Sequence, residues 1–197
     1  MTRKTPLSII LVNHNGDQFL ERCLQSLADQ TLQDFELILV DNASTDKSLI
    51  ILSKTLERHP WLRGKFKLMI NERNLGWGPA GNLGAANSSG LCILFLNSDT
   101  YLPKDSIKNL LECLSVNSIG ACQPLIIENR SGLVQTLGNS CDRYGFAKCN
   151  VQTGSTSRIL VDESFYASGA CLLVRREAFE SSGRFDDQIF LLQDDLD

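Results

Sequence analysis

Four short apolar segments, each followed by a polar turn and then by a helical pattern, make up the first half of the chain. They are LSIILVN (7–13), FELILVD (35–41), FKLMIN (66–71) and LCILFLN (91–97). Strands that are apolar throughout are buried on both faces, and helices between them make successive strands parallel. The pattern therefore predicts an α/β fold with a mostly parallel sheet and helices on both faces.

Four further segments have the residue types or the spacing of helices. They cover residues 17–30, 44–59, 78–90 and 106–117. In the first, apolar side chains recur at helical spacing from Phe19 to Leu27. The second is expected to be capped by Ser44 or Thr45 and to end before Pro60.

The second half of the chain has a different character. Shorter strand-like pieces occur at 120–127 and 132–138, and a polar stretch rich in glycine and serine covers 139–157. Residues 164–183 predict a strand that runs into a short helix. The tail after them ends abruptly in acids, so we expect residues 1–197 to form a single domain that is truncated at its C-terminus.

Composition excludes several classes of protein. A net charge of −4 and a pI near 5.2 argue against a nucleic-acid-binding protein. The apolar runs are too short to span a bilayer, and the N-terminus lacks the features of a signal peptide. Seven scattered cysteines without a C-x-x-C pair indicate reduced, mostly buried thiols and a cytoplasmic location.

Polar side chains follow each of the four predicted strands. In parallel sheets the carboxyl ends of the strands meet at one edge, where ligands bind. One such cluster alone is more typical of a turn or a helix cap, but four at one edge favour a binding site. The clusters comprise Asn13, His14 and Asn15; Asp41, Asn42, Ser44 and Asp46; Asn71, Arg73 and Asn74; and Asn97, Ser98 and Asp99.

Two of these features allow two interpretations each. The small residues of 76–86 let a helix pack closely on the sheet, and they also let a diphosphate approach backbone N–H groups at a helix start. Asp99 suits a divalent cation whose coordination is completed by phosphate oxygens, or it is a solvated turn residue. Trp77 is equally suited to stacking on a ligand and to packing at the turn.

The first βα turn, NHNGDQ, contains one glycine, at Gly16. Dinucleotide-binding folds and P-loops need several glycines at this place to bring the backbone close to phosphates. The turn therefore argues against both classes.

Taken in order along nearly the whole chain, these segments resemble the family 2 inverting glycosyltransferases with the GT-A fold, especially their rhamnosyltransferase-like branch. The segment NERNLGWGPAGNLGAANSSG resembles the family's N-x-G-x-x-x-A-x-N-x-G segment. LFLNSDTYL resembles its D-x-D metal motif, and the end of the chain, QDDLD, resembles its Glu-Asp-x-Asp motif. No single motif is decisive, but the ordered set is specific.

The resemblance implies a nucleotide-binding half over 1–102 and an acceptor-side half over 103–197. It implies that Asp99 coordinates Mg²⁺ or Mn²⁺, with Asn97 nearby, and that Asp195 is the catalytic base, beside Asp194. The family has glutamate where this chain has the shorter Asp194. The implied donor-site residues are Val12, Asn13 and Asp41 for the base, Asn74 and Gly76 for the diphosphate and ribose, and Ser168 and Gly169 for the sugar.

The activity so implied is transfer of a sugar, rhamnose by analogy with the branch, from a dTDP- or UDP-sugar to a hydroxyl group. The expected acceptor is a cell-surface glycan, free or lipid-linked, which would bring the protein to the inner face of the membrane as a peripheral protein. One alternative is a truncated or non-catalytic domain that binds a nucleotide sugar or a protein partner. Another is a sugar nucleotidyltransferase, which should carry a glycine-rich basic loop after the first strand; NHNGDQ is no such loop.

Overall fold

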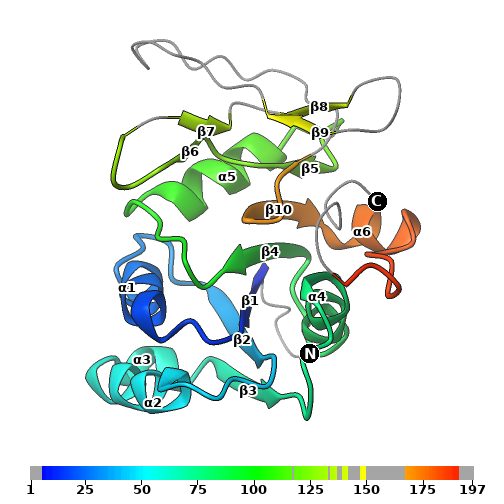
Figure 1. The fold of residues 1–197 in the computed structure, drawn as a ribbon. Coiled ribbons are helices and arrows are strands. Elements are labelled where there is room, and N and C mark those ends of the chain that lie inside the picture. The colour runs from blue at the N-terminus through cyan, green and yellow to red at the C-terminus, as the bar shows by residue number, and fades with distance from the viewer. Residues whose placement is uncertain are drawn as a thin grey trace.

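A six-stranded sheet forms the centre of the protein (Figure 1). The computed structural model describes residues 6–116, 118–132, 134–136, 139–141, 147–149 and 167–190. The strands lie in the order β3-β2-β1-β4-β10-β5. Their bounds are β1 Leu7–Asn13, β2 Phe35–Asp41, β3 Phe66–Ile70, β4 Cys92–Asn97, β5 Ala121–Cys122 and β10 Cys171–Arg175.

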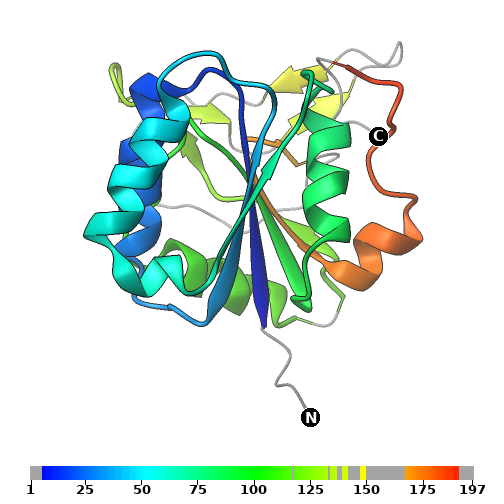
Figure 2. The same ribbon diagram turned by 90° about the horizontal axis from the view of Figure 1, so that it is seen from below.

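Strands β1 to β4 are parallel to one another, and β10 is antiparallel to both β4 and β5. The prediction of a mostly parallel α/β sheet is therefore confirmed. The chain crosses from β1 outward to β2 and β3, and then returns to place β4 on the other side of β1. Strands β1 to β4 run upward in Figure 2, so their carboxyl ends lie together at the top of that view.

Helices cover both faces of the sheet, as predicted (Figures 1 and 2). One face carries α1 (Asp17–Ala28), α2 (Ser48–Arg58), α3 (Pro60–Arg63) and α5 (Ser106–Leu114). The other face carries α4 (Trp77–Ala86) and α6 (Arg176–Ser181). Because strand side chains alternate, Ile9 of β1 enters the α1 layer and Ile10 enters the α4 layer.

Helix α4 packs unusually close to the sheet because its buried face consists of glycine and alanine. A Cβ atom at Gly84 would lie 2.4 Å from Cγ2 of Ile10 and 3.2 Å from Cγ2 of Val40. The structure thus supports the close-packing interpretation of the small residues. It also puts the start of the same helix at the carboxyl edge of the sheet, so the second interpretation stays open.

Two details of the sequence analysis are wrong. Strand β3 was expected to be buried, but it is an edge strand. No strand lies beyond it in the sheet, and Leu68 and Ile70 are 39% and 58% exposed. Helix α2 begins at Ser48 and not at Ser44 or Thr45. The Ser44 hydroxyl bonds to other turn residues, and Asp46 Oδ1 instead accepts the backbone N–H of Ser48 at 2.9 Å.

The strand-like pieces of the second half form two small two-stranded sheets. One pairs β6 (Ile126–Ile127) with β7 (Val134–Thr136), and the other pairs β8 (Asn139–Cys141) with β9 (Ala147–Cys149). Most of the polar stretch predicted at 139–157 lies outside the described residues. The predicted strand and helix within 164–183 are confirmed as β10 and α6.

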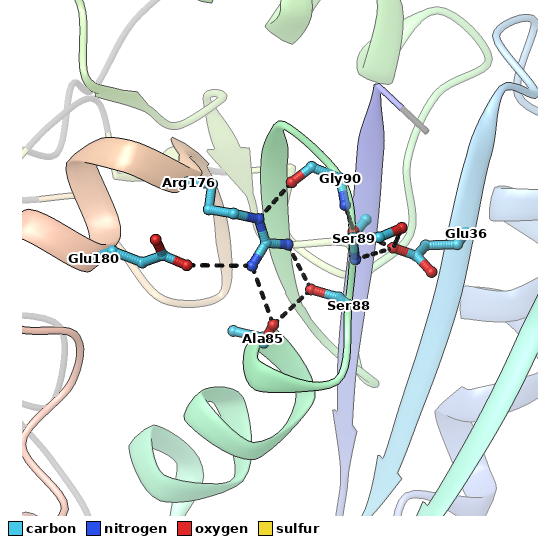
Figure 3. Close-up of polar contacts among 8 residues, drawn as sticks. Glu36, Ala85, Ser88, Ser89, Gly90, Arg176 and Glu180 are labelled. Carbon is cyan, nitrogen blue, oxygen red and sulfur yellow. Dashed lines mark hydrogen bonds and ion pairs between the residues drawn. The ribbon is translucent and has the colours of Figure 1, made fainter. Parts of the chain in front are cut away.

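A polar cluster ties the amino-terminal edge of the sheet together (Figure 3). The Arg176 guanidinium donates to the carbonyl groups of Gly90 and Ala85 and to the Ser88 hydroxyl, at 2.5, 3.2 and 2.7 Å. On the other side of the same loop, Glu36 Oε1 accepts the N–H and hydroxyl of Ser89. The α4–β4 loop is therefore held from both β2 and α6.

The described cysteines fit the expectation of reduced thiols. Cys23 and Cys171 are buried and free. Among the described residues, no helix is long and apolar enough to cross a membrane.

Candidate active site

A cavity of about 330 Å³ lies at the carboxyl edge of the sheet. Its walls come from the turns after β1, β2, β3 and β4 and from the starts of α1 and α4, with one residue of the β1 core and one near the end of the described chain. They are Val12, His14, Asn15, Gly16, Phe19, Asn42, Asn74, Gly76, Trp77, Asn97, Ser98, Asp99 and Phe190. Each of the four polar clusters of the sequence thus contributes to one cavity.

The turns after β1 and β2 are joined by side-chain hydrogen bonds. Asn13 Nδ2 donates to Asp41 Oδ1 at 3.2 Å and to the Ser44 hydroxyl at 3.1 Å, and Asp41 Oδ2 accepts the Ser44 N–H. Asn13 and Asp41 are each 1% exposed and do not line the cavity. They form the layer behind its wall, and their contact with a base stays a prediction. Val12, by contrast, reaches the cavity.

Asn42 is a site residue whose importance the sequence analysis missed. Its Nδ2 donates to Asn74 Oδ1 at 2.7 Å and to the Gly76 carbonyl at 3.0 Å. Its Oδ1 accepts from Asn71 Nδ2 and from the Leu75 N–H, both at 3.0 Å. One buried amide therefore holds the whole loop that leads into α4, and the only sequence signal was its place directly after a buried strand.

Two glycines allow the cavity walls to approach one another. A Cβ at Gly16 would lie 2.3 Å from Asn13 Oδ1 and 2.7 Å from the Ser98 hydroxyl. Gly76 has φ +91°, and a Cβ there would lie 2.5 Å from the Phe190 carbonyl oxygen. Gly76 was predicted from the resemblance; the need for Gly16 follows only from the tertiary structure.

Asp99 stands at the rim of the cavity with its side chain exposed. The turn that presents it is fixed by Thr100, which donates its N–H and its hydroxyl to the Asn97 carbonyl at 3.2 and 2.6 Å. Beside it, the buried Oδ1 of Asn97 has no hydrogen-bond partner. An unpaired buried oxygen is costly, and because Asn97 lines the cavity, an ion or ligand bound there would be a natural partner for it.

The residues present fit a hard divalent cation that is also held by a substrate. Asp99 and Asn97 offer a carboxylate and an amide oxygen, the ligand types that Mg²⁺ and Mn²⁺ prefer. The described residues include no cluster of three His, Cys, Asp or Glu side chains, so they do not enclose a metal by themselves. Mg²⁺ commonly binds through one or two carboxylates together with substrate phosphates, and this donor set matches that mode.

The thiol nearest to this turn is not a nucleophile. Complete burial, and then the negative charge of Asp99, raise the pKa of Cys23 far above its ordinary value. Burial, with a contribution from Cys122, raises the pKa of Cys171 to about 12. Both side chains therefore stay protonated at neutral pH, and covalent chemistry has no activated thiol among these buried groups.

Trp77 packs at the turn, and because it also lines the cavity, stacking on a ligand stays a prediction. Its ring packs on Phe185 and Phe95, with centroids 4.9 and 5.9 Å apart, and it also lines the cavity. The indole Nε1 is buried and has no acceptor. Gly169 lies against the ring, where a Cβ would be 2.9 Å from Cη2, so only glycine fits beside this indole.

The segment Ser168–Ala170 touches the site indirectly. The Ala170 carbonyl accepts the Asn97 N–H at 3.1 Å, and the Ser168 N–H donates to Gln123 Oε1. Neither Ser168 nor Gly169 lines the cavity, and their contact with a donor sugar stays a prediction. Asp194 and Asp195 lie outside the described residues, so their catalytic roles also stay predictions.

The sheet order, the helix layers and the cavity at the carboxyl edge define an α/β protein of the GT-A type. Residues 8–183 match the family model described as "Glycosyl transferase family 2". The chain belongs to that family, as its resemblance implied.

Several curated proteins are similar to this chain. An N-acetylglucosaminyl-diphospho-decaprenol L-rhamnosyltransferase of Mycobacterium tuberculosis is 28% identical over 97% of the chain and 68% of its own length. An uncharacterized glycosyltransferase of Haemophilus influenzae is 31% identical over 57% of the chain and 44% of its own length. The chain thus spans less than half of the latter protein.

Solved structures share the fold. The mannosyltransferase PcManGT from Pyrobaculum calidifontis, solved with GDP-Man and Mn²⁺, superposes with a TM-score of 0.70 at 19% identity over 95% of this chain and 49% of that one. TarS from S. aureus superposes with a TM-score of 0.70 at 23% identity over 96% of this chain and 53% of that one. At these identities the likeness establishes the GT-A fold and no more.

Proposed function

We propose that the protein is an inverting glycosyltransferase that moves a sugar from a nucleoside diphosphate donor to a hydroxyl acceptor. The observation that carries the proposal is the cavity at the carboxyl edge of the sheet, where the exposed Asp99 carboxylate lies beside the unpaired Oδ1 of Asn97. It occurs in a chain of family 2, most of whose length matches the family model.

In this proposal the chain's own residues bind and orient the donor. Val12 lines the cavity, with Asn13 and Asp41 behind it, and these three are assigned to the base. Asn74 and Gly76, fixed by Asn42, are assigned to the ribose and diphosphate. Ser168 and Gly169 are assigned to the donor sugar: Gly169 lies against Trp77, and the next residue, Ala170, accepts the Asn97 N–H.

Asp99 and Asn97 would hold the divalent cation, Mg²⁺ or Mn²⁺. When bound, the cation neutralises charge on the departing diphosphate as a Lewis acid. Asp195, with Asp194 beside it, would take the proton from the acceptor hydroxyl as that oxygen attacks the anomeric carbon opposite the diphosphate. A single displacement needs no enzyme nucleophile, in keeping with the protonated state of Cys23 and Cys171.

The donor base and sugar come from comparison alone. A relative from M. tuberculosis is named as a rhamnosyltransferase, which supports rhamnose as the first candidate for the sugar. The proposed donor is a dTDP- or UDP-sugar, as the family resemblance implied. TarS was solved with UDP and with UDP-GlcNAc. The proposed acceptor is a glycan of the cell surface, free or lipid-linked, and the proposed location is the cytoplasmic face of the membrane.

Isothermal titration with UDP and with dTDP, each with and without Mn²⁺, tests the donor site. We expect binding to the wild type that needs the metal and that is lost in Asp99→Ala, while the exposed control Glu177→Ala binds normally. The tighter nucleotide identifies the donor base. If neither nucleotide binds under any of these conditions, the donor-site assignment is refuted, and a non-catalytic domain explains the chain better.

A further inference from the structure

The strongest feature outside the cavity is an uneven distribution of charge. Residues 47–73 contain seven lysines and arginines but two acids, a net charge of +5 in a chain whose total is −4. The remainder of the chain therefore carries −9. The segment comprises α2, α3 and β3, which form one edge of the molecule, and Figure 2 looks onto that edge with α2 and β3 in front.

The same edge exposes aliphatic side chains. On α2, Leu49 and Ile50 are 36% and 56% exposed, and on β3 the side chains of Leu68 and Ile70 are exposed as well. An apolar hollow of about 250 Å³ separates the helix from the strand, and Leu49 and Leu68 line it together with Arg63. We call the exposed side chains Leu49, Ile50, Lys54, Arg63, Leu68 and Ile70 the α2–β3 face.

Internal contacts engage only some of the basic groups of this edge. Arg58 pairs with Glu21, Lys65 donates to the Gln33 carbonyl, and Lys67 donates to Asn87. Lys54 and Arg63 are exposed and have no hydrogen bond or ion pair within the described part of the chain. Within the hollow, Glu57 is the one acidic side chain among the described lining residues. Free basic charge and exposed aliphatic groups therefore occur side by side.

We propose that the α2–β3 face docks the protein on an anionic lipid bilayer. Such surfaces attract clusters of lysine and arginine, each worth about 1 kcal/mol, or roughly fivefold in affinity, while neighbouring aliphatic groups enter the boundary of the acyl chains. The proposal deepens the proposed function, because a lipid-linked acceptor would be met at that surface. The α2–β3 face is the part of the molecule that would lie against the membrane.

Two other occupants suit the face less well. A second copy of the chain would bring two segments of charge +5 together, and lysines on an edge strand such as β3 oppose strand pairing between copies. A nucleic acid would match the charge, but single strands are held by stacking on aromatic rings. The exposed apolar groups here are aliphatic, and the Trp61 ring packs on Phe35 at 6.0 Å.

The geometry is compatible with an active enzyme on the surface. None of the cavity-lining residues belongs to the α2–β3 face. However, β3 leads directly into the loop 71–76, whose last residues line the cavity. A docked β3 edge therefore leaves the carboxyl edge of the sheet open and places it next to the membrane rather than against it.

Co-sedimentation with vesicles tests the proposal. One set of vesicles contains phosphatidylcholine and phosphatidylglycerol in equal amounts, and the other contains phosphatidylcholine alone. The wild type should bind the anionic vesicles, bind the neutral ones much more weakly, and be released as salt is raised. The double variant Lys54→Gln/Arg63→Gln should bind roughly 25-fold more weakly, at about fivefold per charge.

A second double variant, Ile50→Ser/Ile70→Ser, tests the aliphatic part and should also bind more weakly. The matched control is Lys104→Gln/Lys108→Gln, which removes two exposed lysines near α5, far along the chain from this face. It should bind as the wild type does. Equal loss in the control, or no binding of the wild type to anionic vesicles, would overturn the proposal.

Two companion measurements exclude the other occupants. The membrane proposal would be overturned if sedimentation equilibrium showed a dimer that Ile50→Ser/Ile70→Ser dissociates. It would also be overturned if an oligonucleotide bound through Lys54 and Arg63 in preference to vesicles. Metal-dependent nucleotide binding, measured on the same variants, should be unchanged. If nucleotides fail to bind while vesicles still bind, the proposed transfer activity is refuted but the docking role of the α2–β3 face is supported.

Discussion

At the scale of the residue, the cavity depends on a few positions with no freedom to vary. Asn42 uses both amide hydrogens and its carbonyl oxygen to hold the loop 71–76, and Gly76 provides the backbone conformation with which that loop enters α4. Asn97 and Trp77 carry the opposite feature, since each holds a buried polar atom without a partner. The satisfied groups set the shape of the loop, and the unpaired atoms of Asn97 and Trp77 belong to residues that line the cavity.

Gly76→Ala is expected to lower the free energy of unfolding by about 2–4 kcal/mol and to weaken nucleotide binding. A φ of +91° at ψ 170° is costly for alanine, by about 1–3 kcal/mol, and the new Cβ would also press on the Phe190 carbonyl, 2.5 Å away. Urea unfolding measures the change. The control is Gly183→Ala, which has φ +104° but open space around the Cβ, and it should lose less; an equal loss in both would show that the contact with Phe190 does not matter.

At the scale of the element, helix α4 has residues that pack closely on the sheet but have low intrinsic helix propensity. Glycine costs about 1 kcal/mol in a helix relative to alanine, and α4 contains three. Close approach to Ile10 and Val40 compensates for this cost by bringing the helix, and the loop before it, down onto the core. The position of the cavity wall therefore follows from the packing of α4.

Two glycine-to-alanine substitutions within α4 should differ in their effect on the stability of the fold. At Gly84 the gain in helix propensity, about 1 kcal/mol, is outweighed by overpacking against Ile10, which costs about 1–3 kcal/mol, so Gly84→Ala should destabilise the fold. At Gly81 the nearest atoms lie 3.4 Å from the new Cβ, an ordinary contact, so Gly81→Ala should be neutral or stabilising. Thermal unfolding of the pair measures this, and stabilisation by Gly84→Ala would refute the close packing.

The loop after α4 introduces a dependence of stability on pH. Burial opposes ionisation of Glu36, but hydrogen bonds from Ser8, Ser89 and Gly90 outweigh it and hold the pKa of Glu36 below the ordinary value of 4.5. The folded state therefore binds the proton less tightly than the unfolded state. This stabilisation is complete above pH 4.5 and is lost as the pH falls through the lower pKa of the folded protein.

Glu36→Gln should accordingly remove part of the acid sensitivity. We expect the variant to be less stable than the wild type at pH 7, and the difference to shrink as the pH falls below 4.5. Urea unfolding at a series of pH values gives both curves, with the exposed Glu177→Gln as the control. A difference that stays constant with pH would contradict the role of the Glu36 carboxylate in Figure 3.

At the scale of the whole molecule, the two ends of the sheet have different tasks. Hydrogen bonds close the amino-terminal edge around Glu36 and Arg176, whereas the carboxyl edge keeps a cavity with unpaired polar atoms. A third region, the α2–β3 face, carries the excess of basic charge. Stability, ligand binding and docking can therefore be changed separately by substitution.

Ligand binding should stabilise the whole domain. At about 100 times its Kd, a nucleotide with Mn²⁺ adds about 2.7 kcal/mol to the free energy of unfolding, which raises Tm by about 5–10 °C for a domain of this size. A thermal scan with and without EDTA measures the shift. Asp99→Asn should strongly reduce this shift in Tm without changing the Tm of the free protein. An undiminished shift in that variant would show that Asp99 does not hold the metal.

The sequence by itself determined the strands, the helices and their alternation. Strands β1 and β2 begin and end where their apolar runs do, because residues buried on both faces must be apolar throughout. The location of the cavity also followed, since parallel strands bring the polar residues after each of them to one edge. Family membership, implied by the order of the motifs, was confirmed over residues 8–183.

Only the tertiary structure decided which of these elements lie at an edge and which side chains reach the cavity. Strand β3 reads like its neighbours, but no strand covers it, and so its aliphatic side chains are exposed. Asn42 and Asp41 are adjacent polar residues, yet one lines the cavity and the other lies behind it. The physical reason is that these features depend on contacts between residues far apart in the chain. Such contacts set the strand order, the close approach at Gly16 and Gly84, and which polar atoms stay unpaired.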